Sequence, residues 1–236
     1  MSNEIKICWL GQGGFILEND NYRIVLDPYI SDCVFKIQQL ARMHKFPFAV
    51  EELKTDLLLI THDHMDHFDP EGVPEILAEY PECCCAGPQN SYEHFQKLNV
   101  PEQKLTLSKA GESFSAGPFK ITAIPAFHSD KTACGYMLEC AGKKIVVTGD
   151  TLFNEALFVP EINNADLLLI CINGKFGNMT DSEALEYVKR TSPRCALPMH
   201  YGLFAENTID PADFIADCKK SDVASWAMTP GVFFSI

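Results

Sequence analysis

Three histidines and two aspartates lie within one short stretch, residues 61–67, which reads Thr-His-Asp-His-Met-Asp-His. Burying so many imidazoles and carboxylates is costly unless something pairs with them. Neutral imidazole nitrogens and carboxylate oxygens suit Zn²⁺ or another first-row divalent ion. His62 and His64 are two residues apart, so extended backbone would project both to one side, where they could bind one ion. Asp66 and His67 follow one turn later and could serve a second ion.

The strand that must position this stretch is the continuous apolar run of residues 57–60, typical of a strand covered on both faces. Three further candidate ligands, His128, Asp150 and His200, follow expected strands at residues 119–125, 145–147 and 195–197. Strand ends of one layered sheet gather at one edge, so these side chains could meet the first group. Asp150 is the natural bridging carboxylate, because two neighbouring cations need a shared anionic ligand to limit their repulsion. The alternative, a solvated polar turn, does not explain why all these residues follow strands.

Short β-type runs and a few helix signals make up the rest of the chain. Strands are expected at residues 5–10, 14–18, 22–26, 119–124, 135–140, 143–147 and 167–172. Helices are expected after Asp69-Pro70, over residues 88–98, after a capping box at residues 180–183, and after Asp210-Pro211. Residues 226–236 are expected to form a terminal strand.

The two halves of the chain resemble each other. Residues 55–60, Thr-Asp-Leu-Leu-Leu-Ile, match residues 165–170, Ala-Asp-Leu-Leu-Leu-Ile. Each is preceded by a hairpin-like pair whose second strand leads to an aspartate, Asp27 or Asp150. This predicts an α/β fold of two β-rich halves with flanking helices packed face to face, in a single domain over residues 1–236. Chance similarity between apolar strands is the alternative, because strands share a small alphabet of residues.

Composition narrows the function classes. The 236 residues carry a formal net charge of −13 with no basic stripe, which argues against nucleic-acid binding. No apolar run approaches the roughly 20 residues needed to cross a bilayer, and the N-terminus has no apolar signal core. Ten cysteines, several inside apolar runs, are interpreted as reduced buried thiols of a cytoplasmic protein. A metal site at residues 83–85 is disfavoured because no CxxC pair accompanies them.

The order His62-x-His64-x-Asp66-His67, then His128, Asp150 and His200, resembles the ligand set of the metallo-β-lactamase superfamily. The resemblance covers nearly the whole chain and implies a four-layer αββα sandwich with two divalent ions, Zn²⁺, Mn²⁺ or Fe²⁺. It implies that His62, His64 and His128 hold the first ion and that Asp66, His67 and His200 hold the second, with Asp150 bridging. It also implies that Asp27 orients a ligand imidazole.

Within that superfamily the sequence is most similar to the L-ascorbate-6-phosphate lactonase-like group. The likeness rests on Trp-Leu-Gly-Gln-Gly-Gly-Phe at residues 9–15, Ser-Asp at 129–130, Thr-Gly-Asp-Thr at 148–151, Phe-Gly-Asn-Met-Thr at 176–180 and Met-His-Tyr at 199–201. The chain departs from that lactonase in being considerably shorter and in having a plain His128. The resemblance implies a hydrolase whose metal-bound hydroxide attacks a small, anionic lactone or ester.

Several residues receive roles in this hypothesis. Asp66 is expected to be the general base, and Tyr201 could donate to the leaving oxygen or simply pack near the site. Gln12 lies in a glycine-rich turn that could approach the metals closely. Asn173 and Lys175 follow the strand at 167–172 and are candidate substrate-binding residues, although Lys175 could equally be a solvated surface lysine.

Other readings remain open at this stage. A phosphodiesterase of the same fold is possible for small or cyclic substrates, and a metal-binding module without catalysis is a third class. A di-iron redox enzyme of this fold is expected to have an acidic residue at the position of His64, so His64 favours hydrolysis. His94 is expected to be an exposed helix residue, and His44 with Arg42 and Lys45 forms either a rim for anions or a solvated face. The expected partner is a small-molecule substrate, and a homo-oligomer is also open.

Overall fold

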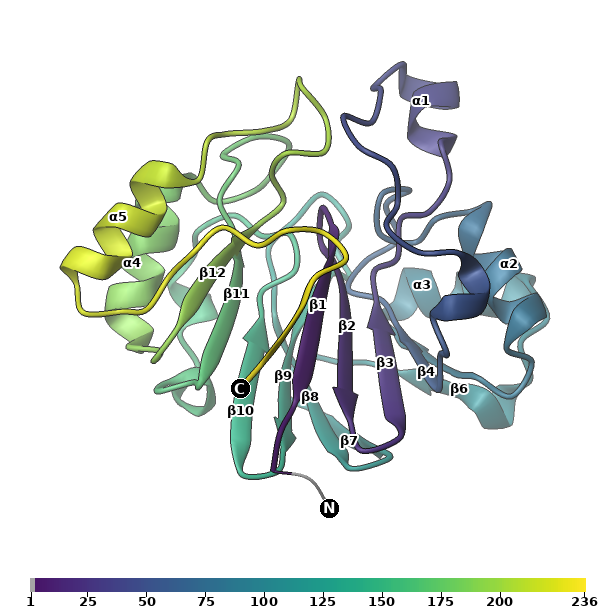
Figure 1. Ribbon diagram of the computed structural model, residues 1–236. Coiled ribbons are helices and arrows are strands. Elements are labelled where there is room, and N and C mark those ends of the chain that lie inside the picture. The colour runs from purple at the N-terminus through teal and green to yellow at the C-terminus, as the bar shows by residue number, and fades with distance from the viewer. Residues whose placement is uncertain (1–2) are drawn as a thin grey trace.

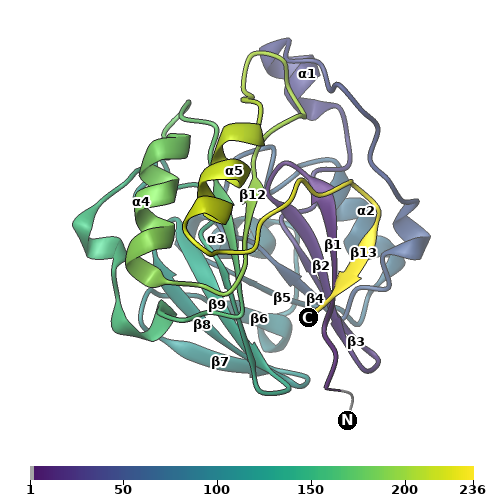
Figure 2. The same ribbon diagram turned by 60° about the vertical axis from the view of Figure 1, so that its left-hand side comes forward.

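The computed structural model describes residues 3–236, in which two β-sheets face each other between helices (Figure 1). The first sheet has the order β13-β1-β2-β3-β4-β5-β6, and the second has the order β12-β11-β10-β9-β8-β7. Figures 1 and 2 show helices α2 (Gly72–Glu79) and α3 (Gln89–Lys97) beside the first sheet, with α4 (Asp181–Thr191) and α5 (Ala212–Lys220) beside the second. The expected four-layer αββα architecture is confirmed.

The remaining elements are short. In the first sheet the strands are β1 (Lys6–Gly11), β2 (Gly14–Asn19), β3 (Tyr22–Leu26), β4 (Leu57–Leu59), β5 (Cys84–Gly87), β6 (Leu105–Leu107) and β13 (Phe233–Ser235). In the second they are β7 (Ser113–Ala116), β8 (Phe119–Pro125), β9 (Cys134–Cys140), β10 (Lys143–Val147), β11 (Leu167–Cys171) and β12 (Ala196–Met199). A six-residue helix, α1 (Cys33–Gln38), lies at the top of Figure 1, and 3₁₀ turns cover Val50–Glu52, Glu102–Lys104, Glu155–Leu157 and Pro160–Ile162.

The two halves share one connectivity, as their sequence similarity predicts. In the first half β1, β2 and β3 are antiparallel neighbours, and β4 and β5 then add in parallel. In the second half β8, β9 and β10 are antiparallel, and β11 and β12 add in parallel. The register is also matched, since Ile24 pairs with Leu57 and Ile145 pairs with Leu167. The loops after β4 and β11 are therefore equivalent positions in the two halves.

Alternation along the strands divides the core into layers. In β1, Ile7 and Trp9 belong to the core between the sheets, whereas Cys8 and Leu10 belong to the core beneath α2 and α3. Period-two alternation of this kind follows from the pleat of a strand. Strand β11 is buried at all five positions, because the first sheet covers one face and helices cover the other. Burying each large apolar side chain contributes about 1.5–3 kcal/mol.

Helix starts follow the sequence signals to within two residues. The capping box before α4 is present: Thr180 Oγ1 accepts from the Glu183 amide at 3.2 Å, and Glu183 Oε2 accepts from the Thr180 amide at 2.9 Å. Asp69 caps the next helix as expected, since its Oδ1 accepts from the amides of Glu71 and Gly72, both at 3.0 Å, although helix α2 itself starts at Gly72 and not at Pro70. The expected terminal strand over residues 226–236 was too long, since only Phe233–Ser235 pairs with β1.

All ten cysteines are free thiols, and only Cys84 is exposed. The groups of potential metal ligands found among residues 3–236 consist of histidines and aspartates. None of the helices in that range combines the length and apolar character that crossing a bilayer requires.

Candidate metal centre

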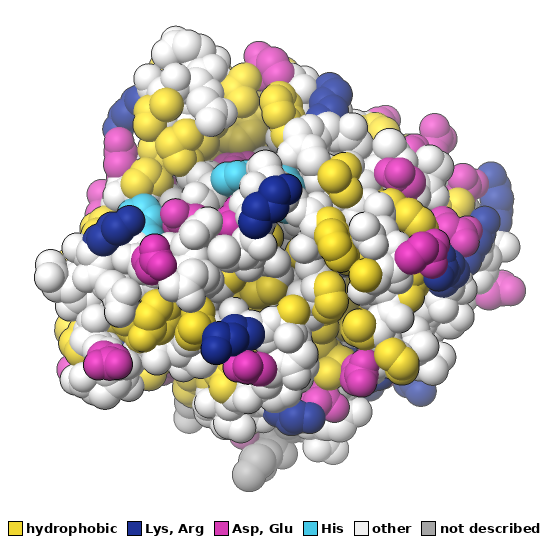
Figure 3. All heavy atoms as spheres, turned by 180° about the vertical axis from the view of Figure 1, so that it is seen from behind, with side chains coloured by type: hydrophobic (Ala, Val, Ile, Leu, Met, Phe, Trp, Pro, Cys, Tyr) yellow, Lys and Arg dark blue, Asp and Glu magenta, His cyan; other side chains and the backbone are white. Residues whose placement is uncertain are grey.

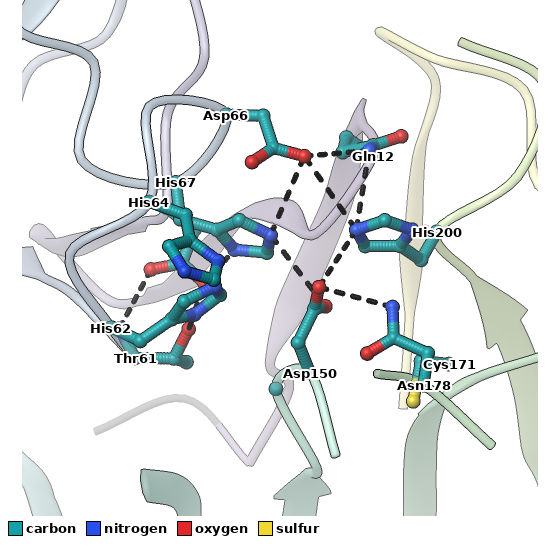
Figure 4. Close-up of polar contacts among 12 residues, drawn as sticks. Gln12, Thr61, His62, His64, Asp66, His67, Asp150, Cys171, Asn178 and His200 are labelled. Carbon is teal, nitrogen blue, oxygen red and sulfur yellow. Dashed lines mark hydrogen bonds and ion pairs between the residues drawn. The ribbon is translucent and has the colours of Figure 1, made fainter. Parts of the chain in front are cut away.

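The predicted ligands converge at one edge of the two sheets, where strands from both halves end. His62, His64, Asp66 and His67 lie in the loop after β4. His128 follows β8, Asp150 follows β10 and His200 follows β12 directly. Figure 4 shows the imidazoles of the β4 loop on one side, His200 on the other, and the carboxylates of Asp66 and Asp150 between them.

One group of three imidazoles forms a compact set of nitrogens. His62 Nε2 lies 3.0 Å from His64 Nδ1, and His128 Nε2 lies 3.1 Å from the same atom. Burial, and then the neighbouring His67, lowers the pKa of His62 well below its usual value, and burial followed by His128 lowers the pKa of His64. These two rings are therefore neutral and can offer lone pairs to a cation.

A second group combines one carboxylate with two imidazoles. Asp66 Oδ2 lies 3.9 Å from His67 Nε2 and 3.7 Å from His200 Nε2. The rings of His67 and His200 are nearly parallel, at 17°, with centroids 5.5 Å apart. The side chains of both histidines are buried, whereas Asp66 is partly exposed and reaches the solvent-accessible side of the site.

Asp150 lies between the two groups. Its Oδ1 is 3.5 Å from His67 Nε2, and its Oδ2 is 2.9 Å from His200 Nε2 and 4.0 Å from His128 Nε2. Burial alone would raise the pKa of Asp150, but His200 and His67 outweigh it and hold that pKa well below the usual range. An ionised carboxylate that contacts imidazoles of both groups has the position that a bridging ligand needs.

Two buried atoms support the fit of a cation to this donor set. His67 Nε2 and Asp150 Oδ1 are fully buried and face each other at 3.5 Å, and neither makes a hydrogen bond in the described part of the chain. Buried polar atoms that make no hydrogen bond are costly, so their presence at the convergence point needs a physical reason. Imidazole nitrogens together with carboxylate oxygens form a donor set that suits Zn²⁺ and other first-row divalent ions.

Outer contacts fix the orientation of the imidazoles. Asp27 Oδ2 lies 2.8 Å from His67 Nδ1, which directs His67 Nε2 towards the site. His128 Nδ1 is 3.0 Å from the carbonyl oxygen of Gly177, which the ring can donate to in the same way. A Cβ atom at Gly13 would lie only 2.6 Å from His67 Cε1, so the turn after β1 can approach this ring only with glycine at that position.

Gln12 supports the ligands themselves. Its Nε2 donates to Asp66 Oδ2 at 2.8 Å and lies 3.2 Å from His200 Nε2. Its backbone oxygen accepts from the His200 amide and from Trp9 Nε1, both at 3.0 Å. The side chain is fully buried, so the structure places this candidate substrate residue against two predicted ligands rather than along the open cleft.

An amide network behind Asp150 was not recognised from the sequence. Asn178 Nδ2 donates to Asp150 Oδ2 at 3.0 Å and to Asn173 Oδ1 at 2.9 Å. Asn173 Nδ2 in turn donates to Asn207 Oδ1 at 2.6 Å, and all three asparagines are buried. Asn173 was predicted as substrate-binding, but its contacts are to this network. The sequence did contain one indication that Asn173 supports the ligands: it lies in the loop after β11, which corresponds to the ligand-bearing loop after β4.

Two predicted residues are not brought into the cleft. Tyr201 stacks on Trp9 with ring centroids 4.9 Å apart, and burial raises the pKa of its hydroxyl to about 12. Lys175 is exposed, and its Nζ donates to the backbone oxygen of Glu206 at 3.0 Å. Neither side chain lines the cleft beside the ligands. These positions fit the alternative interpretations, in which Tyr201 is a packed aromatic residue and Lys175 is a surface lysine.

The sequence interpretation of His94 as an exposed side chain was wrong, because the side chain is partly buried. Its Nδ1 lies 2.9 Å from Asp63 Oδ1, its ring stacks on Phe68 at a centroid distance of 4.1 Å, and 29% of the side chain is exposed. The Asp63 amide also donates to Asp130 Oδ2 at 3.0 Å. These contacts fix the backbone between His62 and His64.

A cleft of about 300 Å³ opens beside the candidate ligands. His64, Asp66, His128, Asp150 and His200 all contribute to its lining. Figure 3 shows histidine and acidic side chains in a hollow on the back of the molecule, with hydrophobic side chains next to them. The volume suits a small molecule, because ligand pockets span roughly 300–1,000 Å³.

Comparison with known proteins agrees with this architecture. A family model described as a beta-lactamase superfamily domain matches residues 22–201. A UPF0173 metal-dependent hydrolase of Pelotomaculum thermopropionicum is 31% identical over 228 residues, covering 89% of this chain and 90% of the relative. Another, from Carboxydothermus hydrogenoformans, is 27% identical and covers 96% and 98%. In fold, the chain is similar to Igni18, a metallo hydrolase of Ignicoccus hospitalis, with a TM-score of 0.78, 22% identity and coverage of 99% and 98%.

Proposed function

This chain belongs to the metallo-β-lactamase superfamily and is a metal-dependent hydrolase, and we propose that it cleaves a small lactone or ester with two divalent cations. The observation that carries the proposal is the convergence of five buried or half-buried imidazoles and the Asp66 carboxylate around Asp150. His67 Nε2 and Asp150 Oδ1, which make no hydrogen bond, support it further, because a cation would satisfy both.

In this proposal the two ligand groups hold one ion each. His62, His64 and His128 form the first site, and Asp66, His67 and His200 form the second. Asp150 is shared, since its two oxygens face imidazoles from both groups. The ions are Zn²⁺, Mn²⁺ or Fe²⁺, for which this mixture of nitrogen and oxygen donors is suited.

Bound divalent ions supply an activated water and polarise the carbonyl under attack. The chain supplies the proton handling and the orientation. Asp66 is the proposed general base, because its carboxylate faces the cleft and Gln12 Nε2 holds one of its oxygens at 2.8 Å. Asn178 holds Asp150 from behind, so the shared carboxylate keeps one orientation through the reaction.

The lactone class of substrate is supported by the motif resemblance, which extends beyond the ligands. The Gly-Gln-Gly-Gly turn places Gln12 on Asp66 and His200, and the Phe-Gly-Asn-Met-Thr segment places Asn178 on Asp150. Both motifs therefore have a physical role at the proposed centre.

The proposal is tested by metal analysis combined with hydrolysis of three substrates: a γ-lactone, an aryl ester and a phosphodiester. We expect about two ions per chain and hydrolysis of the lactone or ester. Asp66→Ala should lose the activity. Asp217→Ala, which removes only the partner of Lys220 on exposed helix α5, is the matched control and should keep it. Metal-loaded protein that cleaves only the phosphodiester would contradict the substrate class, and protein that binds no metal would contradict the enzyme mechanism.

A further inference from the structure

The cleft beside the candidate metal centre has one charged side and one apolar side. Its charged lining residues are all acidic or candidate ligands: Asp63, Asp66 and Asp150 with the imidazoles. Within residues 3–236 no lysine or arginine contributes to the lining. A phosphate or carboxylate held inside the cleft away from the metal centre would therefore meet no cation of the lining, although such groups are bound in proteins mainly by basic side chains.

Basic residues from segments near the cleft are turned towards backbone oxygens. Arg42 is half-buried, and its Nη1 donates to the carbonyl oxygens of Ile30 at 2.6 Å and Ser31 at 3.0 Å. Its guanidinium also lies 4.6 Å from the ring centroid of Tyr29. Lys175 donates to the Glu206 carbonyl, as described above, and the exposed Lys131 donates through Nζ to the His128 carbonyl oxygen at 3.2 Å. Recruiting any of these three cations for an anionic substrate would break a contact that it already makes.

The apolar side of the cleft belongs to a small hydrophobic cluster that joins the two halves. Tyr29, Cys33, Val34, Leu203 and Phe204 form this cluster, and Leu40 and Met65 pack against it while half exposed. Val34, Leu40, Met65 and Phe204 also line the cleft. A substrate with an apolar substituent could remove this surface from water while its reacting group faces the ligands.

Phe176 completes the apolar lining from the opposite loop. Its φ is 52°, a left-handed conformation that bulky residues rarely adopt, and it is flanked by Gly174 and Gly177, which also have positive φ. Its side chain is 66% exposed, so burial in the fold does not explain the aromatic residue at this position. A strained, exposed aromatic at the edge of a cleft is accounted for by contact with a ligand.

We propose that the cleft selects an uncharged lactone or ester whose apolar substituent lies between Phe176 and the wall formed by Leu40, Met65 and Phe204. This inference rests on the proposed hydrolysis of a lactone or ester, and it replaces the anionic substrate expected from the sequence resemblance with a neutral one. Phe176 is a specificity-determining residue: it contacts the substituent and not the bond that is cleaved.

The first experiment uses a series of γ-lactones whose alkyl side chain lengthens from methyl to hexyl, with the same ring carrying a phosphomonoester as the anionic comparison. We expect kcat/KM to rise about two- to fourfold for each added methylene until the wall is covered. We expect the phosphorylated ring to be the poorer substrate. A preference for the phosphorylated ring, or no dependence on chain length, would overturn the inference.

Binding separates this inference from the proposed reaction. The matching γ-lactams keep the ring and the alkyl group but resist hydrolysis, and their affinity for the metal-loaded protein can be measured by calorimetry. Tighter binding with chain length supports the apolar wall even if no lactone is hydrolysed, in which case only the proposed reaction fails. If lactones are hydrolysed but lactam binding does not depend on chain length, the proposed reaction is supported and the proposed contact with the apolar wall is contradicted.

Variants of Phe176 assign the effect to one side chain. Phe176→Asn keeps a residue type that tolerates positive φ but removes the apolar ring, and Phe176→Leu keeps an apolar side chain. We expect Phe176→Asn to lower kcat/KM for the hexyl lactone roughly tenfold and leave the methyl lactone nearly unchanged, with Phe176→Leu in between. Trp226→Asn, at a half-exposed aromatic outside the cleft, should leave the chain-length dependence intact. An unchanged dependence in Phe176→Asn with normal metal content would exclude this role.

Discussion

Asp27 controls which nitrogen of His67 faces the candidate metal centre. Its carboxylate is 1% exposed and accepts three hydrogen bonds: from the Thr61 amide at 2.8 Å, from Thr61 Oγ1 at 2.5 Å and from His67 Nδ1 at 2.8 Å. A carboxylate can only accept when ionised, so this network assigns the proton of a neutral His67 ring to Nδ1. In the neutral ring His67 Nε2 has a free lone pair that points towards Asp150. Burial alone would lower the pKa of His67, but Asp150, Asp66 and Asp27 outweigh it and raise that pKa well above its usual value, so a cation at this position displaces the Nε2 proton.

Asp27→Asn should reverse that assignment without changing the shape of the residue. Asparagine tolerates the positive φ of 45° at this position, so the backbone can stay as it is. The amide oxygen can still accept from the Thr61 amide, but the NH₂ group then faces His67 Nδ1. The ring must accept at Nδ1 and carry its proton on Nε2, which removes the lone pair that a cation would use.

The expected loss is about 10- to 100-fold in affinity for the ion at His67, the usual effect of removing a partner of a ligand imidazole. This corresponds to about 1.4–2.8 kcal/mol of binding free energy. The ion held by His62, His64 and His128 should be affected less, because the hydrogen bonds of Asp27 connect it to His62 through the Thr61 hydroxyl, whose Oγ1 lies 3.0 Å from His62 Nδ1. Calorimetric titration of metal-free protein with Zn²⁺, in competition with a chelator, resolves the two affinities.

Asp69→Asn is the matched control. Asp69 is equally buried and also accepts several hydrogen bonds, among them those from the Ile30 amide at 2.9 Å and the Gly72 amide at 3.0 Å, but it contacts no candidate ligand. It should lower the free energy of unfolding and leave both metal affinities unchanged. Equal loss of metal in both variants would show a general effect of destabilisation, and unchanged affinities in Asp27→Asn would refute the tautomer argument.

Three further outcomes are expected. Gly13→Ala should weaken metal binding at least tenfold in the same titration, because its Cβ would lie 2.6 Å from the His67 ring and displace it. Asn178→Leu should lower kcat roughly 10- to 100-fold in steady-state kinetics by freeing Asp150, and denaturant titration should show a loss of about 1–3 kcal/mol because Asn173 loses its donor. A disulfide exchange reagent should label about one thiol of the native protein at pH 8, and Cys84→Ser should abolish that reaction, because Cys84 is the exposed thiol and the others are buried; burial also raises the pKa of Cys171 to about 12. Its own pKa is also raised, so its labelling rate should increase about tenfold per pH unit while the pH is below that pKa.

The strands and the order of candidate ligands could be predicted from the sequence because both have strong local signals. Apolar runs such as residues 57–60 and 167–172 are buried on both faces, and a strand of that kind needs no tertiary information to be recognised. His128, Asp150 and His200 could be located in the same way, since each follows a strand with a clear apolar pattern, β8, β10 or β12.

The cleft wall and the outer contacts could not be predicted, because they depend on pairs far apart in the chain. Helix α1 has only six residues, too few for a periodic pattern, and its packing against Phe204 joins positions about 170 residues apart. His94 looked like a surface residue because nothing in its own helix indicates that Asp63 lies 2.9 Å away. The amide network of Asn173, Asn178 and Asn207 likewise becomes visible only when three loops are placed together.

Neither half of the chain contains a complete ligand set. The loop after β4 supplies four side chains and the second half supplies His128, Asp150 and His200, so any ion bound by the proposed groups is shared across the interface between the two sheets. By thermodynamic linkage, free metal at about 1,000 times its dissociation constant stabilises the folded chain by about 4.1 kcal/mol per site. Metal supply would then set the steady-state fraction of folded protein, and hence its resistance to proteolysis, as well as its catalytic rate.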